Sequence, residues 1–421
     1  MKDISCFVKV RNSGDYQRDN FDSFLQSIDF CFDIPVIHIT GTNGKGSVTN
    51  YLYNAYLSSG LKVGKFTSPY FYEINEMIET NGKPIDDNSI FEIINDYKKE
   101  IEKFELSPFE IQTFIAFEYF KKQNIDLAII ECGMGGSIDA TNIVNNVMTV
   151  ITSVSLEHTE QLGVSISEIA ENKAGIISSD SRVVVGNLEE DALKTVIKVC
   201  KETNSSLKSL CTPSGIQMTN NSQIFNYGSH ENIEILSLAR YEVEDACIAL
   251  ETMDNLMDLY PVKEKDILQG FRNSINPLRF EIINDYPRII IDGAHNPESI
   301  ETLEKSLTNY AKLSSISTLF ACFKDKNLLI MMNTVATMSE KVIFTTFPHQ
   351  RARKEEDYFL FMEEYSFVEN PFEALEKMLN ENPDNIFVIT GSLAFAAYMK
   401  KAILEGKVNV KVSKPEITSI D

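Results

Sequence analysis

The sequence lacks the features that mark several common classes of protein. It has no run of about 18 apolar residues, so no membrane-spanning helix is expected. Residues 1–6 contain no apolar signal region, and we therefore expect a cytoplasmic protein. The seven cysteines are an odd number, and no two are spaced as Cys-x-x-Cys. This pattern indicates neither a disulfide framework nor a zinc site, and we expect scattered buried thiols.

Basic residues are also scarce. The chain has 39 Lys and Arg against 61 Asp and Glu, and its formal net charge is −22. A surface of this charge repels nucleic acid and anionic lipid, so neither is an expected partner. An anionic small ligand would need a locally basic site. The cations that draw attention for this reason are Lys45, Arg279, Arg351, Arg353 and Lys354.

One glycine-rich stretch organises the N-terminal half. A short apolar segment at 35–39 precedes GTNGKGS at 41–47, and helical spacing follows up to Gly60. Between a strand and a helix, backbone N–H groups and the positive helix end hold an anion, and Lys45 would reach terminal phosphates. A glycine-rich turn without a ligand is the alternative. The predicted phosphate-binding residues of this loop are Gly41, Thr42, Asn43, Gly44, Lys45, Gly46 and Ser47.

Metal-binding side chains follow two further predicted strands. Glu131 ends an apolar run at 125–131, and His158 comes shortly after the strand at 147–152. The carboxyl ends of parallel strands meet at one edge of a sheet. A carboxylate there, beside a phosphate loop, is where nucleotide enzymes hold magnesium, and a neutral imidazole can be a further ligand.

Two capping boxes predict helices that carry functional candidates. Ser107 precedes Glu110 by three residues, and Ser165 precedes Glu168 in the same way. In the second helix the apolar spacing places Lys173 on the buried face, where desolvation lowers the pKa of an amine. A neutral buried amine can take up CO₂ as a carbamate; a lysine whose ammonium reaches solvent is the alternative. We also predict one amphipathic helix over 87–104 and a loop or small hairpin region over 204–234.

Together these motifs resemble the folylpolyglutamate synthase and dihydrofolate synthase family of the Mur ligase superfamily. The likeness extends from residue 35 to residue 392. It rests on GTNGKGS, on ECGMGGSIDATN at 131–142, on KAGI at 173–176 and on DGAHNP at 292–297. It implies an α/β protein with two domains. Residues 1–275 would form a P-loop ATPase-like, Mur-ligase-type ATP-binding domain with a parallel sheet, and residues 276–421 a smaller Rossmann-like ligase domain.

The resemblance also implies roles for particular residues. Lys45, Lys173 and His295 would be catalytic, with Lys173 carbamylated, and Arg279 and Asp292 would join the ATP-binding loop. Glu110 has a purely structural alternative as a helix cap. The residues expected to organise Mg²⁺ are Ser47, Ser68, Glu131 and His158, and those expected to contact substrate are Phe109, Glu110 and Asp139.

The activity implied is ATP-dependent addition of L-glutamate to the carboxylate of a folate through an acyl phosphate. The expected cofactor is Mg²⁺, with K⁺ as an optional further cation. The expected partners are ATP, L-glutamate, and folate or dihydropteroate, and we expect a monomer. Several residues depart from the family pattern. Tyr70 and Glu73 replace the usual His and Arg, Leu278 replaces Gly, and the family's His, Gln and Asn are here Tyr241, Glu242 and Asp245. They leave open a dihydrofolate synthase, another Mur-type amino-acid ligase, a nucleotide-binding switch and a decayed ligase.

Overall fold

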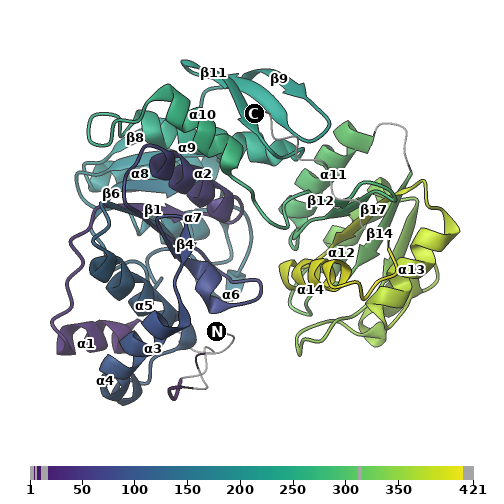
Figure 1. Cartoon of the computed structure of the whole chain (residues 1–421), viewed down its shortest axis with the longest axis horizontal. Coiled ribbons are helices and arrows are strands. Elements are labelled where there is room, and N and C mark those ends of the chain that lie inside the picture. The colour runs from purple at the N-terminus through teal and green to yellow at the C-terminus, as the bar shows by residue number, and fades with distance from the viewer. Residues whose placement is uncertain (1–3, 5–6, 11–17, 312–314, 411–421) are drawn as a thin grey trace. The chain divides into compact units, whose positions relative to one another are not determined.

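The computed structural model describes residues 4, 7–10, 18–311 and 315–410. The chain divides into two compact units (Figure 1). Unit 1 consists of Met1–Leu236 and Glu242–Ile275, and unit 2 of Ser237–Tyr241 and Asn276–Asp421. Helix α9 (Arg240–Asp254) begins in unit 2 and continues in unit 1.

Unit 1 is built on an eight-stranded sheet in the order β4-β3-β2-β5-β1-β6-β7-β8. The six strands from β2 to β8 in this order pair in parallel, and the edge strands β3 and β4 are antiparallel. The predicted parallel sheet is thereby confirmed. The strands are β1 (Val36–Thr40), β2 (Val63–Phe66), β3 (Ile78–Thr80), β4 (Lys83–Pro84), β5 (Leu127–Glu131), β6 (Asn146–Ile151), β7 (Arg182–Val185) and β8 (Ser206–Ser209).

Helices cover both faces of this sheet. The helices of unit 1 other than α9 are α1 (Asp19–Ser27), α2 (Lys45–Ser58), α3 (Asp87–Asp96), α4 (Lys98–Lys103), α5 (Pro108–Gln123), α6 (Thr159–Leu162), α7 (Ile166–Ala174), α8 (Glu190–Glu202), α10 (Glu264–Asn273) and the 3₁₀ helix η3 (Ile74–Met77). Because side chains alternate along a strand, Leu127 and Ile129 of β5 pack with α2, α9 and α10, whereas Ala128 and Ile130 pack with α1, α3 and α5.

The predicted helix over 87–104 is wrong as a single element. The chain leaves helical geometry at Tyr97, which ends α3 and precedes α4. Ile90, Ile94 and Ile101 are nevertheless all buried in the same core. A break is compatible with the apolar pattern, because the pattern specifies the buried face and not the continuity of the backbone. Both predicted capping boxes are confirmed, at the starts of α5 and α7.

Residues 204–234 contain more regular structure than we predicted. They add β8 to the edge of the large sheet and form most of a second sheet in the order β11-β10-β9. Its strands are β9 (Ser214–Met218), β10 (Gln223–Tyr227) and β11 (His230–Ile235). The buried side chains of β10 and β11 join the core that α2, α9 and α10 form on the large sheet.

A histidine clamped by two carboxylates holds this small sheet to the helices. His230 Nδ1 lies 2.7 Å from Glu264 Oε2, and its Nε2 lies 3.0 Å from Asp254 Oδ1. Both ring nitrogens therefore donate, which requires the imidazolium form. The hydrogen bond with Asp254, followed by that with Glu264, raises the pKa of His230 to about 8.

We expect this clamp to make the stability of unit 1 depend on pH. The folded-state pKa lies above the ordinary value of 6.5, so the contribution is complete below about pH 6.5 and is lost as the pH rises through 8. It should amount to about 1–2 kcal/mol. Urea unfolding at pH 6 and pH 9 measures it, with His230→Gln removing the extra pH dependence. His349 supplies the control: burial and Arg351 lower its pKa, so His349→Gln should not remove the loss of stability as the pH rises through 8. A His230→Gln variant with the wild-type pH profile would contradict the assignment.

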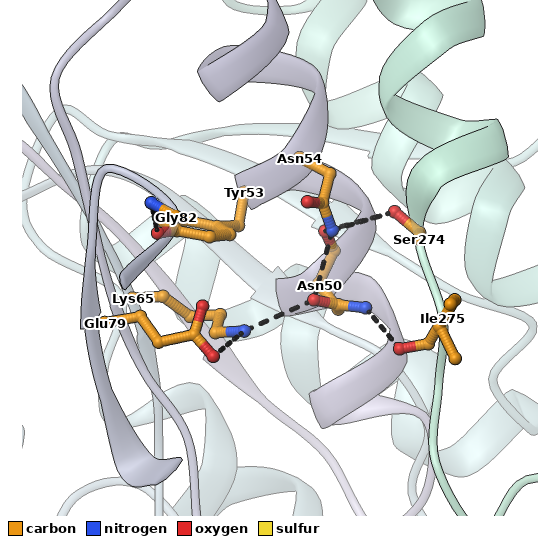
Figure 2. A network of polar contacts seen from close by, with 8 residues as sticks. All are labelled: Asn50, Tyr53, Asn54, Lys65, Glu79, Gly82, Ser274 and Ile275. Carbon is orange, nitrogen blue, oxygen red and sulfur yellow. Dashed lines mark hydrogen bonds and ion pairs between the residues drawn. The ribbon is translucent and has the colours of Figure 1, made fainter. Parts of the chain in front are cut away.

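A second polar network fixes the helix that follows the glycine-rich loop (Figure 2). Lys65 on β2 is buried, forms an ion pair of 3.1 Å with Glu79 on β3, and donates to Asn50 Oδ1 on α2 at 3.3 Å. One helical turn further along, Asn54 Nδ2 donates to Ser274 Oγ at 3.1 Å, just beyond α10. Helix α2 is thus tied on one side to the sheet edge and on the other to the end of α10.

Unit 2 contains a six-stranded sheet in the order β12-β13-β17-β14-β15-β16, parallel except for the edge strand β12. Its strands are β12 (Glu281–Asn284), β13 (Ile289–Ile291), β14 (Ile316–Phe320), β15 (Lys341–Phe344), β16 (Ser366–Phe367) and β17 (Ile386–Thr390). Its helices are α11 (Pro297–Ala311), α12 (Leu328–Met338), α13 (Pro371–Glu381), α14 (Leu393–Leu404) and the 3₁₀ helix η4 (Glu355–Phe361). Helices α11 and α12 share one core with the sheet, while α13 contacts β14 and α14 contacts β17.

The described part of the chain contains no helix that is both long and apolar enough to span a bilayer.

Six cysteines fall within the described residues and all are free thiols. Cys132, Cys200, Cys247 and Cys322 are buried as expected, but Cys31 and Cys211 are exposed, so the expectation of buried thiols is wrong for these two. Cys6 lies outside the described residues.

Candidate active site

The phosphate-binding loop predicted at 41–47 connects β1 to α2. Helix α2 begins at Lys45, and Gly44 before it has a φ of +83°. A Cβ at Gly44 would lie 2.3 Å from Asp245 Oδ1. Both the left-handed backbone and this close approach require glycine. Asp245 of α9 therefore lies directly against the loop.

The residues after β6 hold the loop in place. Ser153 Oγ accepts the N–H of Asn43 at 2.8 Å, and the carbonyl of Ser153 accepts the N–H of Thr42 at 2.9 Å. Thr152 Oγ1 donates to the carbonyl of Asn43 at 2.5 Å. These contacts come from the residues just after the neighbouring strand β6, and they stabilise the conformation of the loop.

Lys45 folds back over the loop. Its Nζ donates to the carbonyls of Gly41 at 3.0 Å and of Thr42 at 3.2 Å. An ammonium has three N–H donors, and these two bonds use two of them. The side chain is half-buried. This geometry places a positive charge at the opening of the backbone turn, as binding of a phosphate chain requires.

Ser47 is buried and its hydroxyl donates to Glu242 Oε1 at 2.7 Å. The other oxygen of Glu242 accepts from the hydroxyl of Tyr51 at 2.8 Å. Sequence analysis did not select Glu242. The available signal was its position beside Asp245, in a segment where the family pattern is not kept.

Three of the predicted metal-site residues lie against the loop or against one another. Glu131 is 4% exposed, and its Oε2 accepts the N–H of Ser68 at 3.3 Å. The same oxygen lies 3.6 Å from the position that a Cβ on Gly46 would take. The side chains of Ser47, Ser68 and Glu131 offer hard oxygen donors, which fit Mg²⁺.

His158 is the N-cap of α6, has a φ of +52° and is exposed. Within the described ranges, no cluster of three or more His, Cys, Asp and Glu side chains is arranged to hold a metal ion. The role of His158 as a metal ligand stays a prediction.

Lys173 lies on the buried side of α7, as predicted, with 3% of its surface exposed. Burial lowers its pKa to about 7, and the positive charge of Lys45 contributes in the same direction. The nearby Cys132, Glu157 and Asp139 act in the opposite direction. Part of the amine is therefore neutral at pH 7, and the neutral amine is the nucleophile that attacks CO₂.

A buried polar chain runs behind β1. His38 Nε2 lies 2.8 Å from Thr141 Oγ1, which in turn donates to Asp139 Oδ1 at 2.6 Å. Burial lowers the pKa of His38 to about 3, so its ring is neutral and Nε2 carries the proton. Asp139 also accepts the N–H of Met134 at 2.7 Å. Thr141 and Met134, the two donors to Asp139, belong to the loop after β5, and contact of Asp139 with substrate stays a prediction.

Phe109 and Glu110 lie at the start of α5. Glu110 is fully buried, and its Oε2 accepts the N–H of Ser107 at 2.6 Å, which confirms the structural role as a helix cap. Phe109 packs against the loop after β5, because a Cβ at Gly133 would lie 2.4 Å from its ring. Contact of these two residues with substrate stays a prediction.

In unit 2, Asp292 follows β13 and is 2% exposed. It accepts hydrogen bonds from the N–H of Phe280 and of Ala294, both at 2.8 Å, and from the hydroxyl of Tyr241 at 2.5 Å. His295 Nδ1 lies 2.9 Å from the carbonyl of Gly293. Because a carbonyl can only accept, Nδ1 carries the proton and Nε2 is the basic nitrogen of the neutral ring.

Arg279 lies between two residues in the left-handed region, Leu278 at φ +60° and Phe280 at +49°. Both neighbours are buried, whereas Arg279 is half-exposed. A glycine would adopt this conformation without strain, and Leu278 stands where the family resemblance leads us to expect one. Such backbone outliers are typical of functional positions, where the surrounding packing enforces them.

The other basic residues of interest hold loops of unit 2 together. Arg351 forms a bidentate pair with Asp325, at 2.8 and 2.9 Å, and lies over the ring of Phe323. Arg353 donates to the carbonyls of Lys324 and Lys326. These contacts explain the positions of Arg351 and Arg353, two of the three cations in the segment 351–354.

Comparison with known proteins assigns this arrangement to a class. Residues 39–257 match the Mur ligase middle domain, and residues 278–393 match the Mur ligase glutamate ligase domain. The chain is therefore a Mur ligase.

Within that class, the folylpolyglutamate synthase of Lacticaseibacillus casei is 32% identical over 388 residues, which cover 88% of this chain and 90% of the relative. The dihydrofolate synthase/folylpolyglutamate synthase of Bacillus subtilis strain 168 is 30% identical over 392 residues, with the same coverage. The chain belongs to the folylpolyglutamate synthase and dihydrofolate synthase family.

Solved structures agree with this assignment. A complex of folylpolyglutamate synthase (FPGS) with AMPPCP and folate has a TM-score of 0.83 and 28% identity, covering 94% of this chain and 97% of that one. The Mycobacterium tuberculosis folylpolyglutamate synthase with ADP and AMPPCP has a TM-score of 0.86, covering 93% and 95%. Its identity of 23% supports the fold alone.

Proposed function

We propose that this chain uses ATP to add L-glutamate to the carboxylate of a folate. The observation that carries the proposal is the phosphate loop, with Lys45 bent over it and Glu131 and Ser47 beside it. A relative named folylpolyglutamate synthase at 32% identity, and an FPGS complex that holds both AMPPCP and folate, support the same substrates.

The reaction proceeds in two transfers. The substrate carboxylate attacks the γ-phosphorus of ATP, and ADP leaves, which gives an acyl phosphate. The amine of glutamate then attacks the acyl carbon, loses a proton and expels inorganic phosphate from the tetrahedral intermediate. Both transfers develop negative charge on phosphoryl oxygens, so preorganised positive groups lower the barrier.

The residues of unit 1 have separate roles in this reaction. Lys45 and the backbone N–H groups of the loop bind the phosphates. Mg²⁺ would be held by Ser47, Ser68, Glu131 and His158, and would neutralise charge on the phosphoryl oxygens. The neutral amine of Lys173 would attack the carbon of CO₂ and release one proton, which converts a buried neutral amine into a buried carbamate anion.

Unit 2 carries three further residues with proposed roles, Arg279, Asp292 and His295. Arg279 contacts phosphate through its guanidinium. Asp292 organises the turn after β13 through its three acceptor contacts, and thereby positions His295, whose Nε2 is basic. We propose that His295 orients the incoming amine.

Phosphate release from the purified protein tests the function. ATP, Mg²⁺ and L-glutamate are supplied with a panel of folates and with dihydropteroate, and the product is identified by mass spectrometry. We expect release only when a folate and glutamate are both present, and a product longer by one glutamyl residue. Release with dihydropteroate and glutamate, but not with any folate and glutamate, would identify a dihydrofolate synthase. Release without either substrate, or none under any condition, would contradict the proposal and favour a nucleotide switch or a decayed ligase.

A further inference from the structure

We propose that the carboxylate of Glu242 positions the Ser47 hydroxyl for the Mg²⁺ that accompanies ATP. This inference rests on the proposed function, because it takes Ser47 as a ligand of that ion. It assigns Glu242 as a positioning residue that acts through Ser47.

The geometry places Glu242 in direct contact with the end of the phosphate loop. Glu242 lies in the first turns of α9 and is fully buried, 195 residues from Ser47 in the sequence. Ser47 Oγ lies 2.7 Å from Oε1, and the Tyr51 hydroxyl lies 2.8 Å from Oε2. Ser47 and Tyr51 are one turn apart on α2, so one carboxylate spans both hydroxyls.

The chemistry of a carboxylate determines the direction of both hydrogen bonds. An ionised carboxylate only accepts, so each hydroxyl must donate its proton to Glu242. The proton of Ser47 then points toward α9, and the lone pairs of its oxygen point elsewhere, available to a cation. A charged acceptor also strengthens the bond and makes the serine oxygen a better donor to metal.

A neutral residue would satisfy the packing but would not fix this direction. Glutamine, which the family resemblance leads us to expect at position 242, has one acceptor oxygen and one amide that donates. With glutamine, one of the two hydroxyls must accept instead, and if that hydroxyl is Ser47 its proton turns toward the metal. A carboxylate at position 242 thus fixes the direction of the Ser47 hydroxyl, which a glutamine would not.

Tyr51 offers a matched control, because it contacts the same carboxylate from the next turn of α2 but is not one of the expected metal ligands. Its ring stacks on Phe271 of α10, with ring centroids 5.0 Å apart. Tyr51→Phe removes one donor to Glu242 and leaves the bond with Ser47. A purely structural role of Glu242 predicts similar effects for variants at both positions, whereas a positioning role does not.

Binding of Mn²⁺ in the presence of AMPPCP, followed by electron paramagnetic resonance, measures the effect without turnover. We expect Glu242→Met to weaken Mn²⁺ binding by about 10–100-fold, Glu242→Gln by about 3–10-fold, and Tyr51→Phe by less than about 2-fold. Thermal unfolding of the ligand-free variants reports the structural loss separately, and Tyr51→Phe should lower that midpoint. Wild-type Mn²⁺ affinity in Glu242→Met and Glu242→Gln would overturn the proposal.

A double-mutant cycle decides the question if Glu242→Met does not fold. In a Ser47→Ala background, Glu242→Gln should have no further effect on Mn²⁺ affinity, because the group that it orients is gone. An equal effect of Glu242→Gln in both backgrounds would overturn the proposal. Failure of the proposed function appears elsewhere, as a wild-type protein that binds AMPPCP and Mn²⁺ but releases no phosphate with folate and glutamate.

Discussion

Lys45→Ala is expected to lower phosphate release by about 10²–10³-fold in kcat, the usual effect of removing one preorganised group that stabilises charge in a transition state. The variant loses the positive charge over the loop and the two bonds to the carbonyls of Gly41 and Thr42. It should also raise the pKa of Lys173, because the charge of Lys45 contributes to lowering it. The amine of Lys173 would then be neutral less often at pH 7, so the substitution acts on two catalytic groups.

Steady-state phosphate release and thermal unfolding together check this expectation. Lys208 on β8 is an exposed lysine of the same unit, and Lys208→Ala changes the net charge by the same amount. It should keep wild-type activity. If Lys45→Ala retained more than about a tenth of the wild-type kcat while Lys208→Ala behaved as expected, the loop would not be the site of phosphate transfer.

Lys173→Met is expected to abolish turnover and to stabilise the fold at acidic pH. The folded-state pKa of Lys173 is lowered to about 7 from 10.5, so the folded protein loses this proton before the unfolded chain does. The buried ammonium therefore destabilises the fold fully below about pH 7, and the penalty disappears between pH 7 and 10.5. Removing it should raise the free energy of unfolding at pH 6 by about 1–4 kcal/mol, and the gain should shrink as the pH rises.

A second buried lysine provides the contrast. Lys65 is 8% exposed but forms an ion pair with Glu79, so Lys65→Met should destabilise the fold by leaving a carboxylate without its cation. Chemical unfolding of both variants at pH 6 and pH 9 measures the difference.

Wild-type activity should also fall in CO₂-depleted buffer and return with bicarbonate. A Lys173→Met variant that turns over at the wild-type rate would rule out a catalytic carbamate.

Local sequence patterns were sufficient where the contacts that decide a structure are close in the chain. The β-branched run before the glycine loop predicted β1, and the two Ser-x-x-Glu boxes predicted the starts of α5 and α7. The patterns failed where distant contacts decided. The break at Tyr97 leaves the buried face unchanged, so the spacing of apolar residues could not predict it. Likewise, the sheet of β9, β10 and β11 depends on packing against α9 and α10.

The candidate site shows the same division. GTNGKGS and the lysine of KAGI were recognisable because the chemistry depends on residue types at fixed short spacings. The acceptor of Ser47 lies 195 residues away, and the partner of His38 lies 103 residues away, so no local pattern pairs them. Pairings of this kind form only when the folded sheet brings the end of one strand close to the start of a helix from another part of the chain.

The sequence by itself predicted the glycine-rich loop and the burial of Lys173 from short spacings, and the family resemblance predicted the parallel sheet. Only the tertiary structure decided that Glu242 and Asp245 lie against the loop and that Glu131 meets Ser68. The physical reason is that side-chain direction, hydrogen-bond polarity and desolvation arise from several elements packing together. Residues from separate elements meet only after the chain has folded.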